Sequence, residues 1–279
     1  MGYPLDVGGR DDYPVKVGSM LLTMVDPHPG YEVAYNRWYE RDHYYEGCMI
    51  GPYLFAGSRW VAPRALKDKR WPPVETVARP YNAGSYVSIY WVQKDHAEDH
   101  FTNWASPQVH WIYANGRGFA ERRHIHTSVF DYLGVVYRDA DGVPVDLALD
   151  ARYDGVVAIW LDAASGDANA LQAELAKDLA AKLVAGSTIE SVSSWTPRGG
   201  DASDQADRSN SPMDLGTRSG GAKRLVQLAF VRGPVEDVLS RVKTYTDAIE
   251  KAGLATLGLV APFYPTAVGT DKYADQLDV

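Results

Sequence analysis

Hydrophobic and polar positions follow two different patterns along this chain, one typical of strands and one typical of helices. Short runs such as 18–25 and 85–92 are rich in Val, Ile, Leu and aromatic residues, the composition of buried strands. Longer stretches such as 167–185, with Leu171 and Leu175 four residues apart, have the period of an amphipathic helix. Because segments with the two patterns alternate along the chain, we predict a protein of mixed α and β structure.

The predicted elements occur in the same order twice. Each half gives strand, helix, strand, strand, helix, strand, and each carries an insertion between its second and third strands, at 63–84 and at 197–222. This shared position indicates an internal duplication. Pro107 is expected to bend or break the second helix. We expect strands at 18–25, 53–62, 85–92, 126–137, 155–161, 188–196, 224–232 and 255–263, and helices at 31–49, 98–115, 167–185 and 234–252.

The repeated unit has the element order of a ferredoxin-like module. Such a module covers one face of its sheet with two helices and leaves an apolar face that needs a partner. Two modules in one chain can satisfy each other, so we predict an α+β fold of tandem ferredoxin-like modules packed as a pseudo-dimeric α+β barrel. The expected parts are an arm at 1–15, a first module at 16–145 that carries the site, and a mainly structural second module at 146–279.

Charge and composition narrow the classes of partner. The net charge of −8 argues against a nucleic-acid partner, and no apolar stretch approaches the roughly 18 residues of a membrane span. Cys48 is the one cysteine, which excludes an internal disulfide and fits a cytoplasmic protein, as does the lack of a signal-peptide pattern in 1–16. The 8 Trp and 18 Tyr suit either a plain core or an aromatic-lined cavity. We expect a small-molecule substrate as partner, with a homodimer as an open alternative.

The most unusual stretch lies on the first predicted helix. Because residues three, four and seven apart share a helical face, Asn36, Tyr39 and His43 line one stripe and Trp38 lies on the adjacent one. Polar groups that can exchange protons, set among aromatic rings, are not typical of a helix that only fills a core. This stretch is therefore the predicted site.

The same stretch resembles a known family. Asn-Arg-Trp-Tyr-Glu-Arg-Asp-His at 36–43, after a strand ending in Asp26-Pro27, is similar to the Asn-x-Trp-Tyr-x-x-x-His opening of EthD-like proteins, members of the dimeric α+β barrel superfamily. The resemblance implies a pocket between sheet and helices. Because the superfamily includes cofactor-independent monooxygenases, polyketide cyclases, aldoxime dehydratases and heme-degrading proteins, it implies no single reaction. The helix at 167–185 lacks the motif, so the site is expected in the first module only.

His43 is the leading catalytic candidate, because a neutral imidazole can accept or donate a proton near physiological pH. Tyr39 lies one turn away and could share or relay that proton, and Asn36 could hydrogen-bond a carbonyl. A structural role for His43 at a helix end is the alternative. Asn36 and Arg59 would stabilise negative charge on oxygen, although Arg59 also suits an ordinary salt bridge. The substrate-binding candidates are Trp38, Arg59, Tyr86, Tyr90, His110 and His126, of which the two tyrosines share a strand face and could flank a planar substrate.

Five further histidines are candidates for other roles. His96 and His100 have metal-ligand spacing, but their acid-rich surroundings are typical of a solvated helix start. We expect His124 and His126 on one strand face, where with His110 they could form a three-nitrogen metal site or a proton relay. No carboxylate or cysteine completes that set, so we predict no metal. His110 is also the candidate ligand if the cofactor is heme.

These observations predict a cofactor-independent acid–base enzyme of the lyase, isomerase or cyclase type. Its substrate would be a small apolar or aromatic compound with a carbonyl, held in an aromatic-lined pocket. Two alternatives stay open. One is a heme-dependent or cofactor-free oxidative enzyme of the monooxygenase or dehydratase type, and the other is a ligand-binding accessory protein without catalysis. Whether the insertion at 197–222 gates the site is also open.

Overall fold

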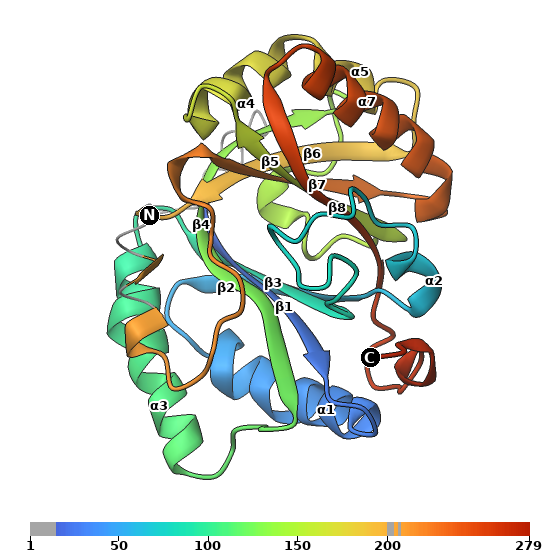
Figure 1. The fold of residues 1–279 in the computed structure, drawn as a ribbon. Coiled ribbons are helices and arrows are strands. Elements are labelled where there is room, and N and C mark those ends of the chain that lie inside the picture. Colours follow the sequence, from blue (N-terminus) through green and yellow to red (C-terminus); the bar gives the residue numbers. More distant parts are fainter. Residues whose placement is uncertain (1–14, 200–203, 206–207) are drawn as a thin grey trace.

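The computed structural model describes residues 15–199, 204–205 and 208–279. Eight antiparallel strands in this part of the chain close into a barrel in the order β1-β3-β2-β8-β5-β7-β6-β4 (Figure 1). The predicted α+β barrel is therefore confirmed. The strands are β1 Val17–Pro27, β2 Leu54–Val61, β3 Tyr86–Gln93, β4 Arg122–Tyr137, β5 Gly155–Ala163, β6 Ile189–Pro197, β7 Arg224–Val231 and β8 Ala255–Pro265.

The barrel consists of two half-sheets with matching strand order. The first half runs β4-β1-β3-β2 and the second runs β8-β5-β7-β6. The seam between β4 and β6 is long, whereas β2 and β8 pair only at Trp60 with Pro265 and Val61 with Tyr264. Helices lie outside the barrel, with α1 and α3 on one side, α4, α5 and α7 on the opposite side, and the short α2 beside β8 (Figure 1). Because the inner faces of both half-sheets meet, neither half leaves its apolar inner face bare.

Strand alternation fills the barrel interior. Successive side chains of a strand point to opposite faces, so Met20 and Leu22 of β1 point inward, where both are buried. Trp91 of β3 and Trp195 of β6 stack there with ring centroids 5.8 Å apart. The contact joins the two halves, so burial of these large rings stabilises the assembled barrel rather than one half alone.

The helices of the two halves differ in type. In the first half, α1 is followed directly by wide π-helical turns, and η4 is also a π-helix that continues into α3 at Ser106. Pro107 therefore marks a change of helix type rather than a break. The first-half helices are α1 Glu32–Trp38, η2 Tyr39–His43, η3 Tyr45–Met49, α2 Arg64–Lys67, η4 Glu98–Ala105 and α3 Ser106–Ala114, and those of the second half are α4 Ala168–Lys177, α5 Leu179–Val184 and α7 Leu239–Lys251. Short 3-10 turns lie at Val145–Leu147, Gly221–Lys223, Val235–Val238 and Ala274–Gln276.

Each insertion packs on the other half of the barrel. The first insertion bridges β8 through Trp71 and Val260. The second returns along β4, where the Leu215 carbonyl accepts from the Thr127 amide at 3.0 Å. The two halves are thus joined by their insertions as well as by their strands.

Residues 264–279 lie against the first half rather than forming a free polar tail. The Asn36 side chain donates to the Thr270 carbonyl at 2.9 Å, and Arg37 pairs with Asp271 at 2.5 Å. Leu277 is completely buried in an aromatic cluster that includes Tyr86. This segment therefore covers the stripe that begins at Asn36. No helix in the described residues is long and apolar enough to cross a membrane.

Candidate functional site

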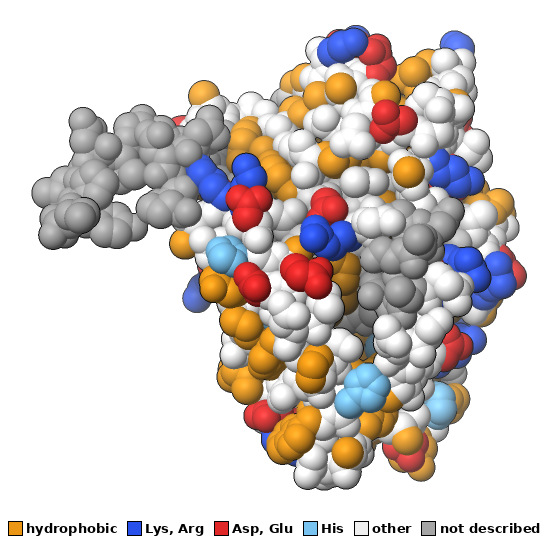
Figure 2. All heavy atoms as spheres, turned by 90° about the vertical axis from the view of Figure 1, so that its left-hand side faces the viewer, with side chains coloured by type: hydrophobic (Ala, Val, Ile, Leu, Met, Phe, Trp, Pro, Cys, Tyr) orange, Lys and Arg blue, Asp and Glu red, His pale blue; other side chains and the backbone are white. Residues whose placement is uncertain are grey.

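A cavity of about 260 Å³ lies on the outer face of the first half-sheet, beneath its helices. Its floor comes from Leu21 and Thr23 of β1 and from Thr127 and Val129 of β4. The second insertion supplies part of the wall through residues 210–215. Figure 2 shows the left-hand side of Figure 1, the side of α3, where hydrophobic and charged side chains are interspersed on the surface. The cavity is thus built from both halves of the chain.

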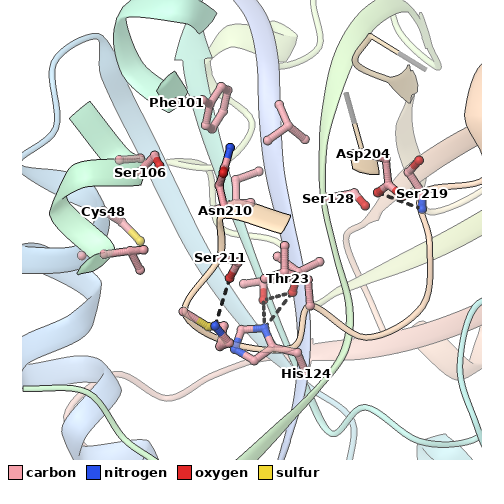
Figure 3. A pocket seen from close by; sticks show the side chains of 18 of the residues that line it. Thr23, Cys48, Phe101, Ser106, His124, Ser128, Asp204, Asn210, Ser211 and Ser219 are labelled. Carbon is pink, nitrogen blue, oxygen red and sulfur yellow. Dashed lines mark hydrogen bonds between the residues drawn. The ribbon is translucent and has the colours of Figure 1, made fainter. Parts of the chain in front are cut away.

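The cavity has a helical wall and a wall from the second insertion. Figure 3 shows Cys48, Ser106 and Phe101 from the helices around the same space as Asn210 and Ser211 from the insertion. The cavity is therefore lined both by apolar side chains and by side chains with hydroxyl or amide groups. Such a lining suits a small ligand with an apolar body and a few polar atoms.

His43 lines this cavity from the π-helical turn η2. Its ring stacks on Trp38 with centroids 4.6 Å apart and meets the edge of Tyr39 at 5.2 Å. Its Nδ1 atom is buried without a hydrogen-bond partner among the described residues. Burial, with Arg122 and His124 as further causes, lowers the pKa of His43 well below its usual value. The imidazole is therefore neutral at neutral pH, in the form that accepts a proton.

Gly47 provides the space for this ring. A Cβ atom at position 47 would lie 2.5 Å from the Nδ1 atom of His43. A glycine one helical turn after the histidine therefore lets the imidazole lie against the backbone. The wide turns of η2 and η3 are a form of helix that occurs frequently at functional sites.

Arg122 and His124 form the opposite side of the site, at the start of β4. The Arg122 Nε atom donates to the His124 Nε2 atom at 3.2 Å, and the His124 Nδ1 atom bonds to the Thr127 hydroxyl at 2.8 Å. Burial and the nearby Arg122 charge lower the pKa of His124 to about 3. His124 is therefore neutral, with both ring nitrogens engaged, and it holds the arginine in place.

Tyr39 lines the cavity but keeps its hydroxyl turned to the sheet. The hydroxyl groups of Tyr39 and Tyr90 lie 2.8 Å apart, and Cys48 is buried beside them. Burial raises the pKa of Tyr39 far above its usual value and that of the Cys48 thiol to about 12. All three groups therefore keep their protons at neutral pH.

The structure places Asn36, Arg59 and Tyr86 together, but away from the cavity. Arg59 donates to the Asn36 side-chain oxygen at 3.1 Å and pairs with Glu40 at 3.4 Å. Its guanidinium lies over the rings of Tyr39 and Tyr86, 4.3 and 4.9 Å from their centroids. Residues 264–279 cover this group, which explains why the stripe predicted from Asn36 to His43 opens to the cavity only at Tyr39 and beyond.

The other predicted binding residues lie in three different places. Trp38 supports His43 from behind and donates its ring N–H to the Arg117 carbonyl at 2.9 Å. Tyr90 is buried beneath Tyr39. His110 is exposed, and its Nδ1 atom bonds to the Ser106 carbonyl at 2.9 Å. None of these three side chains lines the cavity.

His124 and His126 do not share a strand face, contrary to expectation. A register shift between Met24 and Val25 of β1 separates them. His126 is fully buried inside the barrel, with its Nδ1 atom 3.0 Å from the Thr217 hydroxyl, whereas His124 faces the cavity. β4 begins at Arg122, earlier than predicted, because the sequence before position 126 is too polar to read as a strand.

The proposed metal and heme ligands are not brought together. Within residues 15–199, 204–205 and 208–279, no group of three His, Cys, Asp or Glu side chains is placed to hold a metal ion. His110 lies outside the cavity, and His124 has both nitrogens engaged. The described residues therefore do not fit a heme held by either histidine.

Sequence reasoning missed Arg122 altogether and considered His124, with His126 and His110, as part of a three-nitrogen metal site or a proton relay. A polar Arg-Arg-His run directly before a predicted strand is the local signal that was available. Its meaning depends on the second insertion, because Met213 approaches the Arg122 Nη2 atom at 3.6 Å. Contacts across so long a stretch of sequence leave no local pattern.

Comparison with known proteins gives the fold but no family. No protein-family model matches the chain, and no curated protein matches it. A solved structure described as an anthrone oxidase-like protein superposes with a TM-score of 0.54 and 7% identity, covering 92% of this chain and 95% of the other. A candidate chlorite dismutase gives a TM-score of 0.50 and 10% identity, covering 94% and 100%. The chain shares an α+β barrel fold with these two structures. At these identities the similarity extends to the fold alone.

Proposed function

We propose that this protein is a cofactor-independent enzyme that moves a proton on a small carbonyl compound, with His43 as the general base. One observation carries the proposal. A neutral imidazole lines the cavity, and its buried Nδ1 atom has no hydrogen-bond partner among the described residues. A histidine held for structure alone would be expected to use its ring nitrogens, as His124 does.

The reaction begins with removal of a proton from the carbon next to the carbonyl. His43 takes the proton, and the electron pair of the broken C–H bond moves onto the carbonyl oxygen as an enolate. Return of the proton at another carbon is an isomerisation, and departure of a leaving group from the adjacent carbon is an elimination. Stacking on Trp38 and the edge contact with Tyr39 fix the ring plane for this step.

Tyr39 is a positioning residue in this proposal rather than a proton relay. Its hydroxyl is engaged with Tyr90, and its raised pKa keeps it protonated. The ring, not the hydroxyl, contacts His43. The shared motif at 36–43 further supports kinship with EthD-like proteins, with the two matching half-sheets as the product of a duplication.

An oxidative reaction is the second candidate. A structure with the same fold is described as anthrone oxidase-like. The enolate formed at His43 is also the species that would pass electrons to dioxygen, so the first step would be the same. Oxygen uptake during turnover distinguishes the two candidates, because isomerisation and elimination consume none.

The deciding experiment compares His43→Ala with His28→Ala, an exposed histidine on the turn after β1. Aryl alkyl ketones and arylacetaldehydes are incubated with each protein in D2O, and exchange of the proton on the carbon next to the carbonyl is followed by NMR. We expect His43→Ala to lower exchange by roughly 10²–10⁴-fold, the usual contribution of a general base, and His28→Ala to leave it unchanged. Full exchange in His43→Ala would refute the assigned base. Binding of these compounds without exchange by the wild-type protein would make it a ligand-binding protein.

The pH profile follows from the same assignment. Because His43 must be unprotonated to act, exchange should rise with pH through the pKa of His43 and level off above it. That pKa lies well below the usual value, so the plateau should be reached before neutral pH. An acid limb centred at or above pH ~6.5, the ordinary histidine value, would contradict the described environment.

A further inference from the structure

We infer that the cavity is built for a substrate with a carboxylate group, which Arg122 binds beside His43. The inference rests on the proposed proton transfer at His43 and specifies the substrate class. Its starting point is a cation that lines the cavity and forms no ion pair with any described carboxylate.

All of the hydrogen bonds that hold Arg122 go to neutral groups. Its Nε atom donates to His124 at 3.2 Å, and its Nη2 atom donates to the Tyr113 hydroxyl at 3.0 Å. Its Nη1 atom is buried and has no partner among the described residues. A buried donor on a charged group is costly to leave unpaired, so an acceptor is missing from this site.

Other arginines near the cavity are paired with carboxylates. Arg117 pairs with Asp42 at 3.0 Å, and Arg198, which lines the cavity, pairs with Asp131 at 2.7 Å. Asp204 is the acidic side chain in the lining, and Arg208 holds it at 3.0 Å. Arg122 therefore differs from these neighbouring arginines, because no described carboxylate pairs with its positive charge.

The guanidinium is also fixed in orientation. Its central carbon lies 4.6 Å from the centroid of the Trp38 ring, and His124 and Tyr113 hold two of its nitrogens. A planar guanidinium held in this way can donate from its unpartnered Nη1 atom to a carboxylate oxygen with little loss of conformational freedom. The apolar lining residues Leu21, Phe101, Val109 and Val129 leave room for a small aromatic body.

Arg122 and His43 influence each other through charge. The positive charge of Arg122 is one of the causes that lower the pKa of His43. A bound carboxylate would offset that charge and raise the pKa of His43, which makes the imidazole a stronger base. A substrate with a carboxylate would thus make His43 a stronger base, whereas His43 is a weaker base when the site is empty.

Binding of benzoate and of its neutral analogue benzamide tests the inference without any turnover. Affinities are measured by calorimetry for the wild-type protein, Arg122→Gln, and Arg117→Gln as the matched control outside the cavity lining. We expect benzoate to bind the wild type at least about tenfold more tightly than benzamide. Arg122→Gln should weaken benzoate by roughly 10- to 100-fold and leave benzamide unchanged, and Arg117→Gln should change neither. Equal binding of the two ligands by the wild type, or an equal loss in Arg117→Gln, would overturn the inference.

A second measurement remains decisive if Arg122→Gln does not fold. The pKa of His43 is followed by NMR of the labelled imidazole in the wild type, with and without saturating benzoate. We expect benzoate to raise this pKa and benzamide to leave it in place, whereas no difference between the two would overturn the inference. Because neither measurement needs catalysis, loss of benzoate selectivity with exchange at His43 intact would refute only this inference. Benzoate binding with exchange unaffected in His43→Ala would refute only the proposed function.

Discussion

The two halves of the barrel share a strand order but cover their outer sheet faces differently. In the second half, α4 and α7 pack buried aliphatic side chains such as Leu175, Val242 and Ile249 toward the sheet. In the first half, the π-helical turns and the aromatic rings around His43 leave a cavity of about 260 Å³. The same sheet topology therefore supports one face packed with aliphatic side chains and another face that borders a cavity.

The difference lies in the helices rather than in the sheet. A π-helical turn is wider than an α-helical turn, so successive side chains meet the sheet at a different angle. Small residues such as Gly47 then admit polar rings that a regular leucine stripe would exclude. Paired substitutions in the two halves can test this explanation.

The largest contrast is expected from removing an aliphatic side chain on each side. Leu175→Ala in the second half should lower the free energy of unfolding by about 2–5 kcal/mol, because it leaves a void among buried aliphatic side chains. Val109→Ala enlarges a space that already exists, so its effect on stability should be under about 1 kcal/mol and its main effect on KM. Urea unfolding and steady-state kinetics measure both, and equal stability losses would refute the distinction between the halves.

Gly47→Ala tests whether the close approach of His43 to the helix backbone matters. The added methyl group would meet the imidazole at 2.5 Å, so the ring must shift. We expect turnover to fall by roughly tenfold to a hundredfold and stability by about 1–3 kcal/mol. The control is Gly134→Ala on β4, where the new Cβ would meet only the flexible end of Gln172 at 2.9 Å. Normal turnover in Gly47→Ala would show that the position of His43 is not critical.

His126→Gln tests the acid sensitivity of the barrel interior. Burial, with nearby arginines, lowers the pKa of His126 to about 3, so this residue stays neutral in the folded state while the unfolded chain takes up a proton. Its contribution to stability is complete above pH ~6.5 and is lost progressively as the pH falls from that value toward 3. Between pH 7 and 5, the wild type should lose up to about 2 kcal/mol more unfolding free energy than His126→Gln. Chemical denaturation at both pH values measures this, and identical pH dependence of the two proteins would contradict it.

The smallest effect is expected for a hydroxyl removed from each half. Tyr39→Phe removes the contact with Tyr90, and Tyr245→Phe removes the bond to Gln227 at 2.9 Å. Each should cost about 1 kcal/mol of stability. Because Tyr39 positions His43 through its ring, Tyr39→Phe should change turnover by less than about threefold. A loss of a hundredfold or more would instead make its hydroxyl a participant in the proton transfer.

The sequence predicted the fold well because its strand and helix periods are local. The stripe through Leu171 and Leu175 and the insertion at the same place in each half are visible without any tertiary information. The site was predicted only in part. His43 and Tyr39 were placed on the helix that lines the cavity, and the structure brings both to it.

The arginine that lines the cavity was not predictable in the same way. Arg59 and Arg122 both lie on strands of the first half, and nothing near either residue shows which one faces a cavity. Residues 264–279 cover the group around Arg59, while the second insertion forms a wall beside Arg122. Both arrangements depend on segments far away in the chain, so no local pattern shows that Arg122 lines the cavity and Arg59 does not.

The packing of residues 264–279 on the first half also has a consequence in time. The ribosome makes β1, α1 and β3 early, yet Leu277 completes the aromatic cluster around Tyr86, and Asp271 pairs with Arg37. During synthesis, part of the aromatic surface of the first half is therefore exposed to water until this segment is made. Exposed apolar surface of this kind promotes chaperone binding or aggregation. The aromatic cluster in the half that carries the proposed catalytic base would therefore be completed only after translation has reached this segment.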